Sequence, residues 1–146
     1  MQTFVKAIAL GIGLLCPMVA TAQDVITYEF DGSFEDGTFA LENAIIDRGL
    51  VIDYVSHVGE MLARTGADVG SDVEIFNNAD IYLFCSAAVS RRVMEADPMN
   101  IVHCPYSIFV ADMGDGVVFG HRAYPDGPMQ EVEAMLDAII IEAREQ

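Results

Sequence analysis

Two cysteines and one histidine in the second half of the chain are the residues best suited to chemistry: Cys85, His103 and Cys104. In an exported protein, two cysteines favour a disulfide, and closing a loop of about 20 residues would stabilise the fold by roughly 3 kcal/mol. The bond requires Cα atoms within about 7 Å, yet Cys85 is expected to end one strand and Cys104 to precede another. A buried free thiol at Cys85, or a reactive or metal-binding pair, are the two alternatives.

The same three side chains offer soft ligands that suit copper or haem iron. The sequence contains no C-x-x-C, C-x-x-C-H or H-E-x-x-H motif, so only residue type supports a metal. Asp53 and His57 share one face of an expected strand and form a second candidate site for a ligand or metal, although a solvent-facing strip explains them equally well.

Enzymatic hydrolysis has no support in the sequence. There is no G-x-S-x-G motif, and no nucleophile stands at a recognisable offset from any of the three histidines. His121 and Tyr124 should point to opposite faces of the last strand by alternation, so they should not share a cavity. These observations predict a protein without catalytic activity.

Alternating and helical hydrophobic patterns predict the elements that would position these residues. A capping box of Ser33 and Asp36 begins the clearest helix, and Gly49 ends it. Every residue from 81 to 85 is apolar, which is typical of a strand covered on both faces. The expected strands are 25–30, 50–58, 81–85, 106–111 and 117–124, and the expected helices are 33–49, 59–65, 86–97 and one from about 126 onward.

This order of elements predicts a single α+β domain with two layers, in which helices pack on an antiparallel sheet. Residues 113–116 are rich in glycine and should join the last two strands as a hairpin. We expect a ligand pocket to lie between the sheet and the long helices.

The N-terminus has the pattern of a signal peptide. Lys6 precedes an apolar run over residues 7–20, and Ala20-Thr21-Ala22 is the small-x-small sequence that signal peptidase recognises. We therefore expect residues 1–22 to be cleaved, residues 23–146 to form the domain, and the protein to be periplasmic or secreted. The apolar run is shorter than the 18 to 20 residues of a membrane span.

The chain is strongly acidic, with 23 acidic and 7 basic residues and a formal charge of −16. Removal of Lys6 with the leader leaves six arginines and a formal charge of −17. A negative field of this size repels phosphate backbones and anionic lipid, so the sequence predicts no nucleic-acid partner and no membrane partner after cleavage. A basic periplasmic protein would be attracted.

Several segments together resemble a bacterial and archaeal family known as domain of unknown function 302. They are Ser33-Phe34-Glu35 before a helix, Cys85 at a strand end, Met94-Glu95-Ala96-Asp97-Pro98, and Pro105 before Ile108-Phe109-Val110. The resemblance implies a two-layer fold similar to the β-α-β4-α arrangement of TATA-binding protein, often dimeric, and implies no activity. Ser86-Ala87 replaces the Asn-Pro common in the family, and Tyr106 stands where a second cysteine is frequent.

The sequence as a whole predicts an exported, non-enzymatic binding or interaction domain, with a homodimer or a basic periplasmic protein as partner and no cofactor. The alternative is a thiol-redox protein, or one that binds copper or haem, in which Cys85, Cys104 and His103 do the chemistry.

Overall fold

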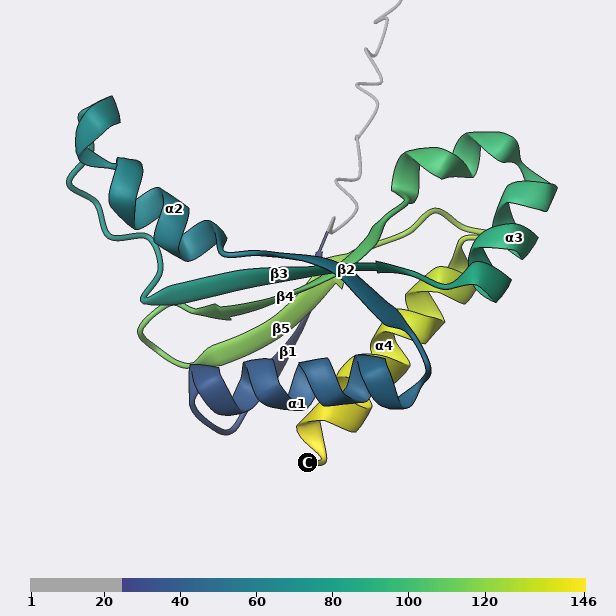
Figure 1. Ribbon diagram of the computed structural model, residues 1–146, viewed down its shortest axis with the longest axis horizontal. Coiled ribbons are helices and arrows are strands. Elements are labelled where there is room, and N and C mark those ends of the chain that lie inside the picture. The colour runs from purple at the N-terminus through teal and green to yellow at the C-terminus, as the bar shows by residue number, and fades with distance from the viewer. Residues whose placement is uncertain (1–24) are drawn as a thin grey trace, which may run out of the picture.

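The computed structural model of the protein describes residues 25–146 (Figure 1). The predicted signal peptide, residues 1–22, lies outside the described residues. Among the helices of the described part, none has the length and apolar character that crossing a bilayer would require. The strands are β1 (Val25–Phe30), β2 (Val51–Ser56), β3 (Asn78–Cys85), β4 (Tyr106–Asp112) and β5 (Val117–Arg122), and the helices are α1 (Phe34–Asp47), α2 (Val58–Thr65), η1 (Ala67–Val69), α3 (Ala87–Ala96), η2 (Pro98–His103) and α4 (Gln130–Arg144).

The five strands form one antiparallel sheet in the order β1-β5-β4-β3-β2. The hairpin of β4 and β5 lies inside the sheet, while β1 and β2 are the two edge strands. The expected two-layer α+β class and its β-α-β4-α order are confirmed, with α2 and α3 as additions between the strands.

Helix α1 begins with the predicted capping box. The backbone N–H of Asp36 donates to Ser33 Oγ (3.1 Å), and the backbone N–H of Ser33 donates to Asp36 Oδ2 (3.3 Å). Gly49 follows the helix with a φ of 70°, a left-handed conformation that glycine adopts without a steric penalty. The local sequence therefore sets both ends of this helix.

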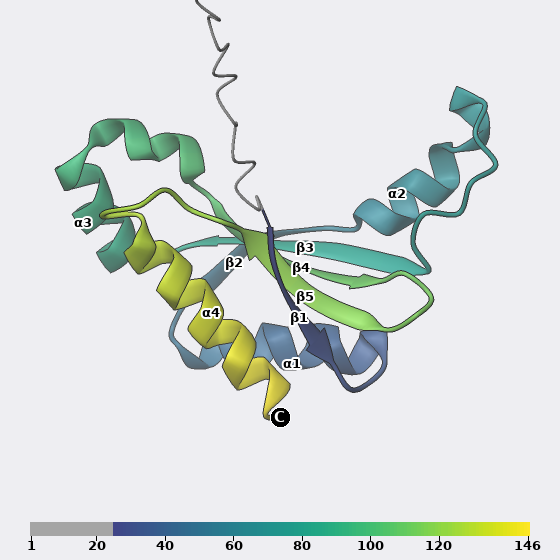
Figure 2. The ribbon, with the colours of Figure 1, turned by 180° about the vertical axis from the view of Figure 1, so that it is seen from behind.

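Helices α1 and α4 lie side by side on one face of the sheet (Figures 1 and 2). Their apolar residues at helical spacing meet the inward side chains of the strands, so that this interface is the hydrophobic core. Its fully buried members from the two helices are Leu41, Ala44, Ile45, Val132, Leu136, Ile139, Ile140 and Ala143, and those from the strands are Phe84, Tyr106, Ile108, Val110 and Phe119.

The prediction of a pocket between the sheet and the long helices is wrong, because these buried side chains fill that space. A cavity of about 810 Å³ lies instead at one end of the sheet, between the loop after β1 and the β4–β5 hairpin. Its lining includes the acidic residues Glu29, Asp31, Glu35, Asp112 and Asp115 together with Arg144.

Two segments extend from opposite ends of the strands; in the second of them η2 rises on the side away from α1, while α3 packs beside α4 (Figures 1 and 2). We call residues 58–77, which contain α2 and η1, the first arm. Residues 86–104, which contain α3 and η2, form the second arm. Exposed apolar side chains occur on both: Met61, Val69, Val73 and Ile75 on the first arm, and Met99, Ile101 and Val102 on the second.

Several predicted boundaries differ from the structure, and β2 spans Val51–Ser56 rather than 50–58. Strand β3 begins at Asn78, three residues earlier than expected, because Asn78, Ala79 and Asp80 all find partners on β4. Strand β5 ends at Arg122 rather than Tyr124. Helix α4 begins at Gln130 because residues 127–129 first form single turns, in which the N–H groups of Gln130 and Glu131 donate to carbonyls three residues back.

Gly59 explains how the first arm is attached. A Cβ added there would lie 2.5 Å from the backbone nitrogen of Ala79, so α2 approaches β3 more closely than any side chain permits.

We predict that Gly59→Ala lowers the free energy of unfolding, measured by urea denaturation, by about 1–3 kcal/mol. The steric clash should outweigh the better helix propensity of alanine. Gly37→Ala is the matched control because its nearest neighbour, 3.3 Å away, is the movable ring of Phe30. Equal effects in the two variants would contradict this interpretation.

Candidate functional site

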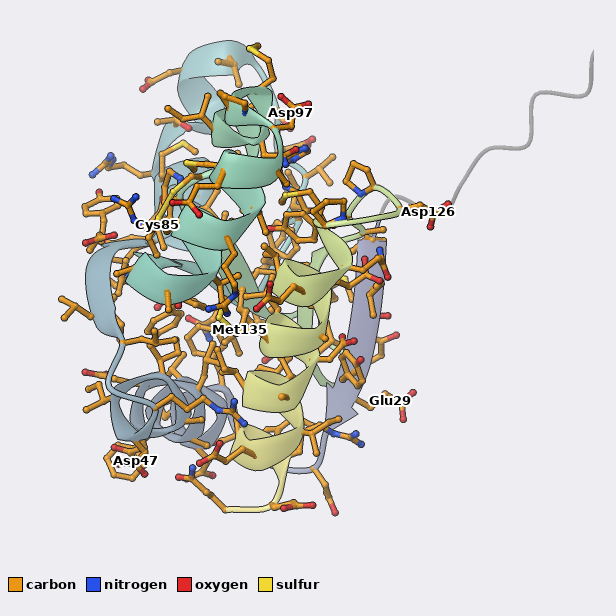
Figure 3. The ribbon with its side chains drawn as sticks, turned by 90° about the vertical axis from the view of Figure 1, so that its right-hand side faces the viewer. Glu29, Asp47, Cys85, Asp97, Asp126 and Met135 are labelled. Carbon is orange, nitrogen blue, oxygen red and sulfur yellow. A yellow bond between two sulfur atoms is a disulfide. The ribbon has the colours of Figure 1, made fainter. Side chains whose placement is uncertain are left out.

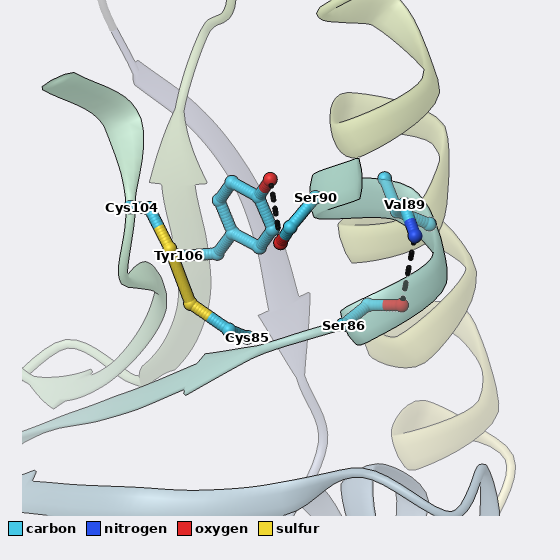
Figure 4. Close-up of a disulfide and its surroundings, with 6 residues drawn as sticks. All are labelled: Cys85, Ser86, Val89, Ser90, Cys104 and Tyr106. Atoms are coloured by element: carbon cyan, nitrogen blue, oxygen red, sulfur yellow. Dashed lines mark hydrogen bonds between the residues drawn. A yellow bond between two sulfur atoms is a disulfide. The ribbon is translucent and has the colours of Figure 1, made fainter. Parts of the chain in front are cut away.

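The two cysteines of the described chain form a disulfide (Figure 4). Cys85 is the last residue of β3 and Cys104 follows η2, with 6.8 Å between their Cα atoms. The sequence left open a disulfide, a free thiol at Cys85, or a reactive or metal-binding pair, and the structure contains the disulfide. It ties the end of the second arm back to the sheet, and neither sulfur is then available as a thiolate ligand.

Hydrogen bonds around the disulfide fix the start of the second arm (Figure 4). Ser86 caps α3, since its Oγ accepts from the backbone N–H of Val89 at 3.3 Å. Ser90 Oγ donates to the hydroxyl of Tyr106, which is fully buried, at 3.2 Å. These contacts are structural, and Ser86 begins α3 as the expected helix over 86–97 requires.

His103 lies next to the disulfide and faces an aromatic cluster. Its ring centroid is 5.6 Å from that of Tyr124, which is in turn 6.3 Å from that of Tyr106. The Nδ1 of His103 and the hydroxyl of Tyr124 are both buried and lack a hydrogen-bond partner within residues 25–146. Burial raises the pKa of Tyr124 to about 12. In that same part of the chain, no three His, Cys, Asp or Glu side chains are grouped as a metal site requires.

The strand face that His57 and Asp53 were expected to share does not form, because β2 ends at Ser56. Strand β2 contains a bulge between Ile52 and Tyr54, which breaks the alternation on which that prediction rested. His57 lies just after the strand, where its Nδ1 is 2.8 Å from Asp80 Oδ1. The imidazole is 61% exposed, so this is a surface contact between the start of the first arm and β3.

His121 is a buried polar residue whose partners the sequence analysis did not predict. Its side chain has no exposed surface. The Nε2 atom is 2.9 Å from Asp137 Oδ1 on α4, and Nδ1 is 2.8 Å from the backbone carbonyl of Arg122. Tyr28 donates its hydroxyl to the same carboxylate oxygen at 2.6 Å. Burial, followed by this hydrogen bond, raises the pKa of Tyr28 to about 12.

These contacts determine what His121 can do. A backbone carbonyl only accepts hydrogen bonds, so Nδ1 carries a proton. Both nitrogens are engaged, so neither is free to act as a general base. The Tyr28–Asp137–His121 network therefore joins β1, β5 and α4 rather than forming a catalytic group.

His121 and Tyr124 were expected to face opposite directions, and this prediction is also wrong. Because β5 ends at Arg122, strand alternation no longer governs Tyr124, whose ring centroid lies 6.5 Å from that of His121. The backbone N–H of Tyr124 donates to Glu133 Oε2 at 2.7 Å, which holds this turn against α4.

On the face of the sheet opposite α1 and α4, no helix of residues 25–146 packs over the centre (Figures 1 and 2). We call it the open face. Phe109 lies in its middle, packed directly on Gly120, where a Cβ would collide with the ring. By strand register the open face contains Val25, Thr27 and Glu29 from β1, Val118, Gly120 and Arg122 from β5, Ser107, Phe109 and Ala111 from β4, Ala79, Ile81, Leu83 and Cys85 from β3, and Val51, Tyr54 and Ser56 from β2.

The expectation that β3 is covered on both faces holds for only one face. Tyr82 and Phe84 are buried beneath the helices, whereas Ile81 and Leu83 on the open face are only half-buried. A strand whose sequence is typical of a doubly covered position thus has one apolar side in contact with water.

Comparison with known families assigns the chain. The model of the family described as "Domain of unknown function DUF302" matches residues 26–121, which include all five strands up to His121. The chain belongs to the DUF302 family. A search of curated proteins found no match.

The fold is also that of a solved DUF302 structure. The crystal structure of an uncharacterized conserved DUF302 protein from Bacillus stearothermophilus is similar with a TM-score of 0.58 and 18% sequence identity. The similarity covers 85% of this chain and 90% of that one. At this identity the likeness concerns the fold alone.

We predict that Asp137→Ala lowers the free energy of unfolding by about 2 kcal/mol, because it leaves His121 and the Tyr28 hydroxyl without their acceptor. Glu131→Ala is the control. It removes a partner of Arg92 that is 2.9 Å away in a solvent-exposed pair, and should lower the free energy of unfolding clearly less than Asp137→Ala does. Thermal and urea denaturation measure the stability of both variants. If Asp137→Ala lowers the free energy of unfolding no more than Glu131→Ala does, the network does not stabilise the fold.

The raised pKa values of three tyrosines predict that the protein loses stability at alkaline pH. The pKa values of Tyr28, Tyr82 and Tyr124 are each raised to about 12, with burial as the main cause. Between pH 10 and 12 the unfolded chain releases these protons while the folded chain keeps them, so stability falls as pH rises. Tyr124→Phe should change stability by less than about 1 kcal/mol at pH 7, since the hydroxyl has no partner, and should reduce the alkaline decline. An unchanged decline in urea titrations at several pH values would contradict the assignment.

Proposed function

We propose that this DUF302 protein is an exported, non-enzymatic interaction domain that binds a protein surface through its open face. One observation supports this proposal above the others. The register places only two charged residues on that face, Glu29 and Arg122, and both lie toward the β1 edge. In the whole chain 21% of residues are charged, and acidic residues prevail.

The composition of the open face matches that of a protein interface. The centres of such interfaces are depleted of charge and enriched in aromatic and apolar side chains. Here Phe109, Ile81, Leu83 and Val118 are half-buried in the single chain, so a partner would remove their remaining apolar surface from water. Tyr54, at 65% exposure, extends the same surface toward the β2 edge.

Export is supported by the N-terminal sequence and by the disulfide. Disulfides persist in oxidising compartments such as the periplasm and are rare in the cytosol. The Cys85–Cys104 bond closes a segment of the size for which the chain-entropy model gives roughly 3 kcal/mol of stabilisation. A structural disulfide of this kind needs no redox role.

A second candidate function is thiol-redox chemistry, or copper or haem binding, by Cys85, Cys104 and His103. The observation in its favour is the buried and unpartnered Nδ1 of His103 beside Cys104. Reduction of the disulfide by an added dithiol reductant would supply two thiols, one of them on the residue that follows His103 in the sequence. Copper or haem could then be detected by metal analysis and absorption spectroscopy of the purified reduced protein.

The interaction function predicts that a photo-crosslinking amino acid at Leu83 captures a protein in the periplasm of the producing cell. The control position is Phe39 on α1, which is 69% exposed and on the opposite layer. Discrete adducts at position 83 and none at position 39, identified by mass spectrometry, are the expected result. If no discrete adduct forms at position 83, the proposal is wrong.

The double variant Cys85→Ser/Cys104→Ser separates the two functions. For an interaction domain it should be less stable by roughly 3 kcal/mol but should still give the adduct at Leu83 at a temperature where it is folded. Metal or haem held by the reduced wild-type protein and lost in this variant would support the second candidate instead.

A further inference from the structure

Strand β1 is a sheet edge without the features that usually keep an edge from pairing. Within residues 25–146 it pairs only with β5, in a register that is continuous over the whole strand. The other edge strand, β2, is interrupted by a bulge between Ile52 and Tyr54. Bulges, prolines and lysines protect natural edges, and β1 has none of the three. Figure 3 shows β1 at the outer margin of the sheet, with Glu29 pointing away from α4.

The outer side of β1 carries backbone groups that lack a partner. Along an edge strand, every second residue directs its N–H and C=O away from the neighbouring strand. No loop, helix or side chain of residues 25–146 forms a hydrogen bond with these groups of β1. An extended segment laid alongside β1 would satisfy them, as a strand does when it extends a sheet.

Side chains on the inner side of β1 are also incompletely covered. Ile26, Tyr28 and Phe30 are only half-buried, whereas Phe119, opposite Tyr28 on β5, has no exposed surface. The difference arises because β5 has a strand on each side and β1 has a strand on one side only. An added strand with apolar residues at alternate positions would remove this remaining apolar surface from water.

The charges beside β1 favour a basic occupant. The cavity of about 810 Å³ at the end of the strand is lined by five carboxylates, those of Glu29, Asp31, Glu35, Asp112 and Asp115. Arg144 is the cation in that lining, and none of these six side chains forms a salt bridge within residues 25–146. Arg122 of β5 lies at the other end of the strand, opposite Val25. A cation supplied by a partner at the cavity would therefore enter an uncompensated negative field.

We propose that an extended, basic segment of another protein adds to the sheet along β1, with a lysine or arginine beside Glu29 and the acidic cavity. Backbone hydrogen bonds supply the affinity of such a contact, and alternate side chains supply its selectivity. Apolar residues of the segment lie on the side of Tyr28, and basic ones on the side of Glu29. A second copy of this chain is a poorer occupant, because its own β1 brings another Glu29 and no cation. This edge is separate from the open face, so the inference goes beyond the proposed function.

A fluorescent, capped peptide of alternating valine and lysine, as long as β1, tests the proposal with the purified chain. Main-chain hydrogen bonds tolerate different side chains, so a generic peptide with this pattern should bind, as measured by fluorescence anisotropy. Two further peptides of the same charge carry N-methyl groups, one on every valine and the other on every lysine. One of them should bind about tenfold more weakly or worse, because its N-methyl groups meet β1, and the other should stay within about threefold of the parent.

Variants of the protein test the charge at the edge. Glu29→Lys should weaken binding of the parent peptide by about fivefold or more, because a repulsive cross-strand pair replaces an attractive one. Glu42→Lys makes the same change in net charge at an exposed position on α1. At an ionic strength of about 0.15 M distant charges are largely screened, so this control should alter binding by less than about twofold. Circular dichroism confirms that each variant is folded.

Three results would overturn the proposal. The first is no binding of the parent peptide, or equal binding of all three peptides, which would mean attraction by charge alone. The second is an equal effect of Glu29→Lys and Glu42→Lys. The third is a dimer of the chain alone that excludes the peptide, which would assign the edge to a second copy. The crosslinker at Leu83 tests the open face separately, so adducts there without peptide binding leave the proposed function standing.

Discussion

The burial of α1 and α4 against one face of the sheet is the interaction on which the rest of the structure depends. These are the two longest helices, and both place their apolar stripes on the same side, where Leu41, Ile45, Leu136 and Ile139 have no exposed surface. The single core that results is large enough for a domain of this size. Because both helices pack on that side, the centre of the other face has no helix of the described chain packed on it.

Much of this fold could be predicted from local sequence. Ser33 and Asp36 give the capping box, Gly49 ends the helix, and alternating residues in β1 give a strand with the predicted bounds, because each signal acts within a few residues. The hydrophobic patterns also gave the order of the elements, and the wider resemblance to the DUF302 family added the β-α-β4-α arrangement of the fold. Neither source could show which strand face stays uncovered, since that depends on how the helices dock.

The candidate sites were harder to predict because they depend on contacts distant in sequence or on irregular backbone. His121 meets Asp137 only once α4 lies across β5, and no spacing motif marks that pair. The bulge in β2 removed Asp53 from the face expected for it, and the true partner of His57 is Asp80 on another strand. The paired cysteines were visible in the sequence, but the choice between disulfide and free thiols required the distance between β3 and the end of η2.

The tip of the second arm has a thermodynamic consequence for any complex that includes it. Asp97 Oδ1 accepts from the N–H of Met99 (2.9 Å), the Asn100 amide donates to the Val93 carbonyl (2.8 Å), and Cys104 ties the segment to the sheet. The loop is therefore immobilised during folding, while Met99 remains 71% exposed. A receptor that covers this tip has little backbone freedom left to restrict, so more of the favourable desolvation appears as affinity.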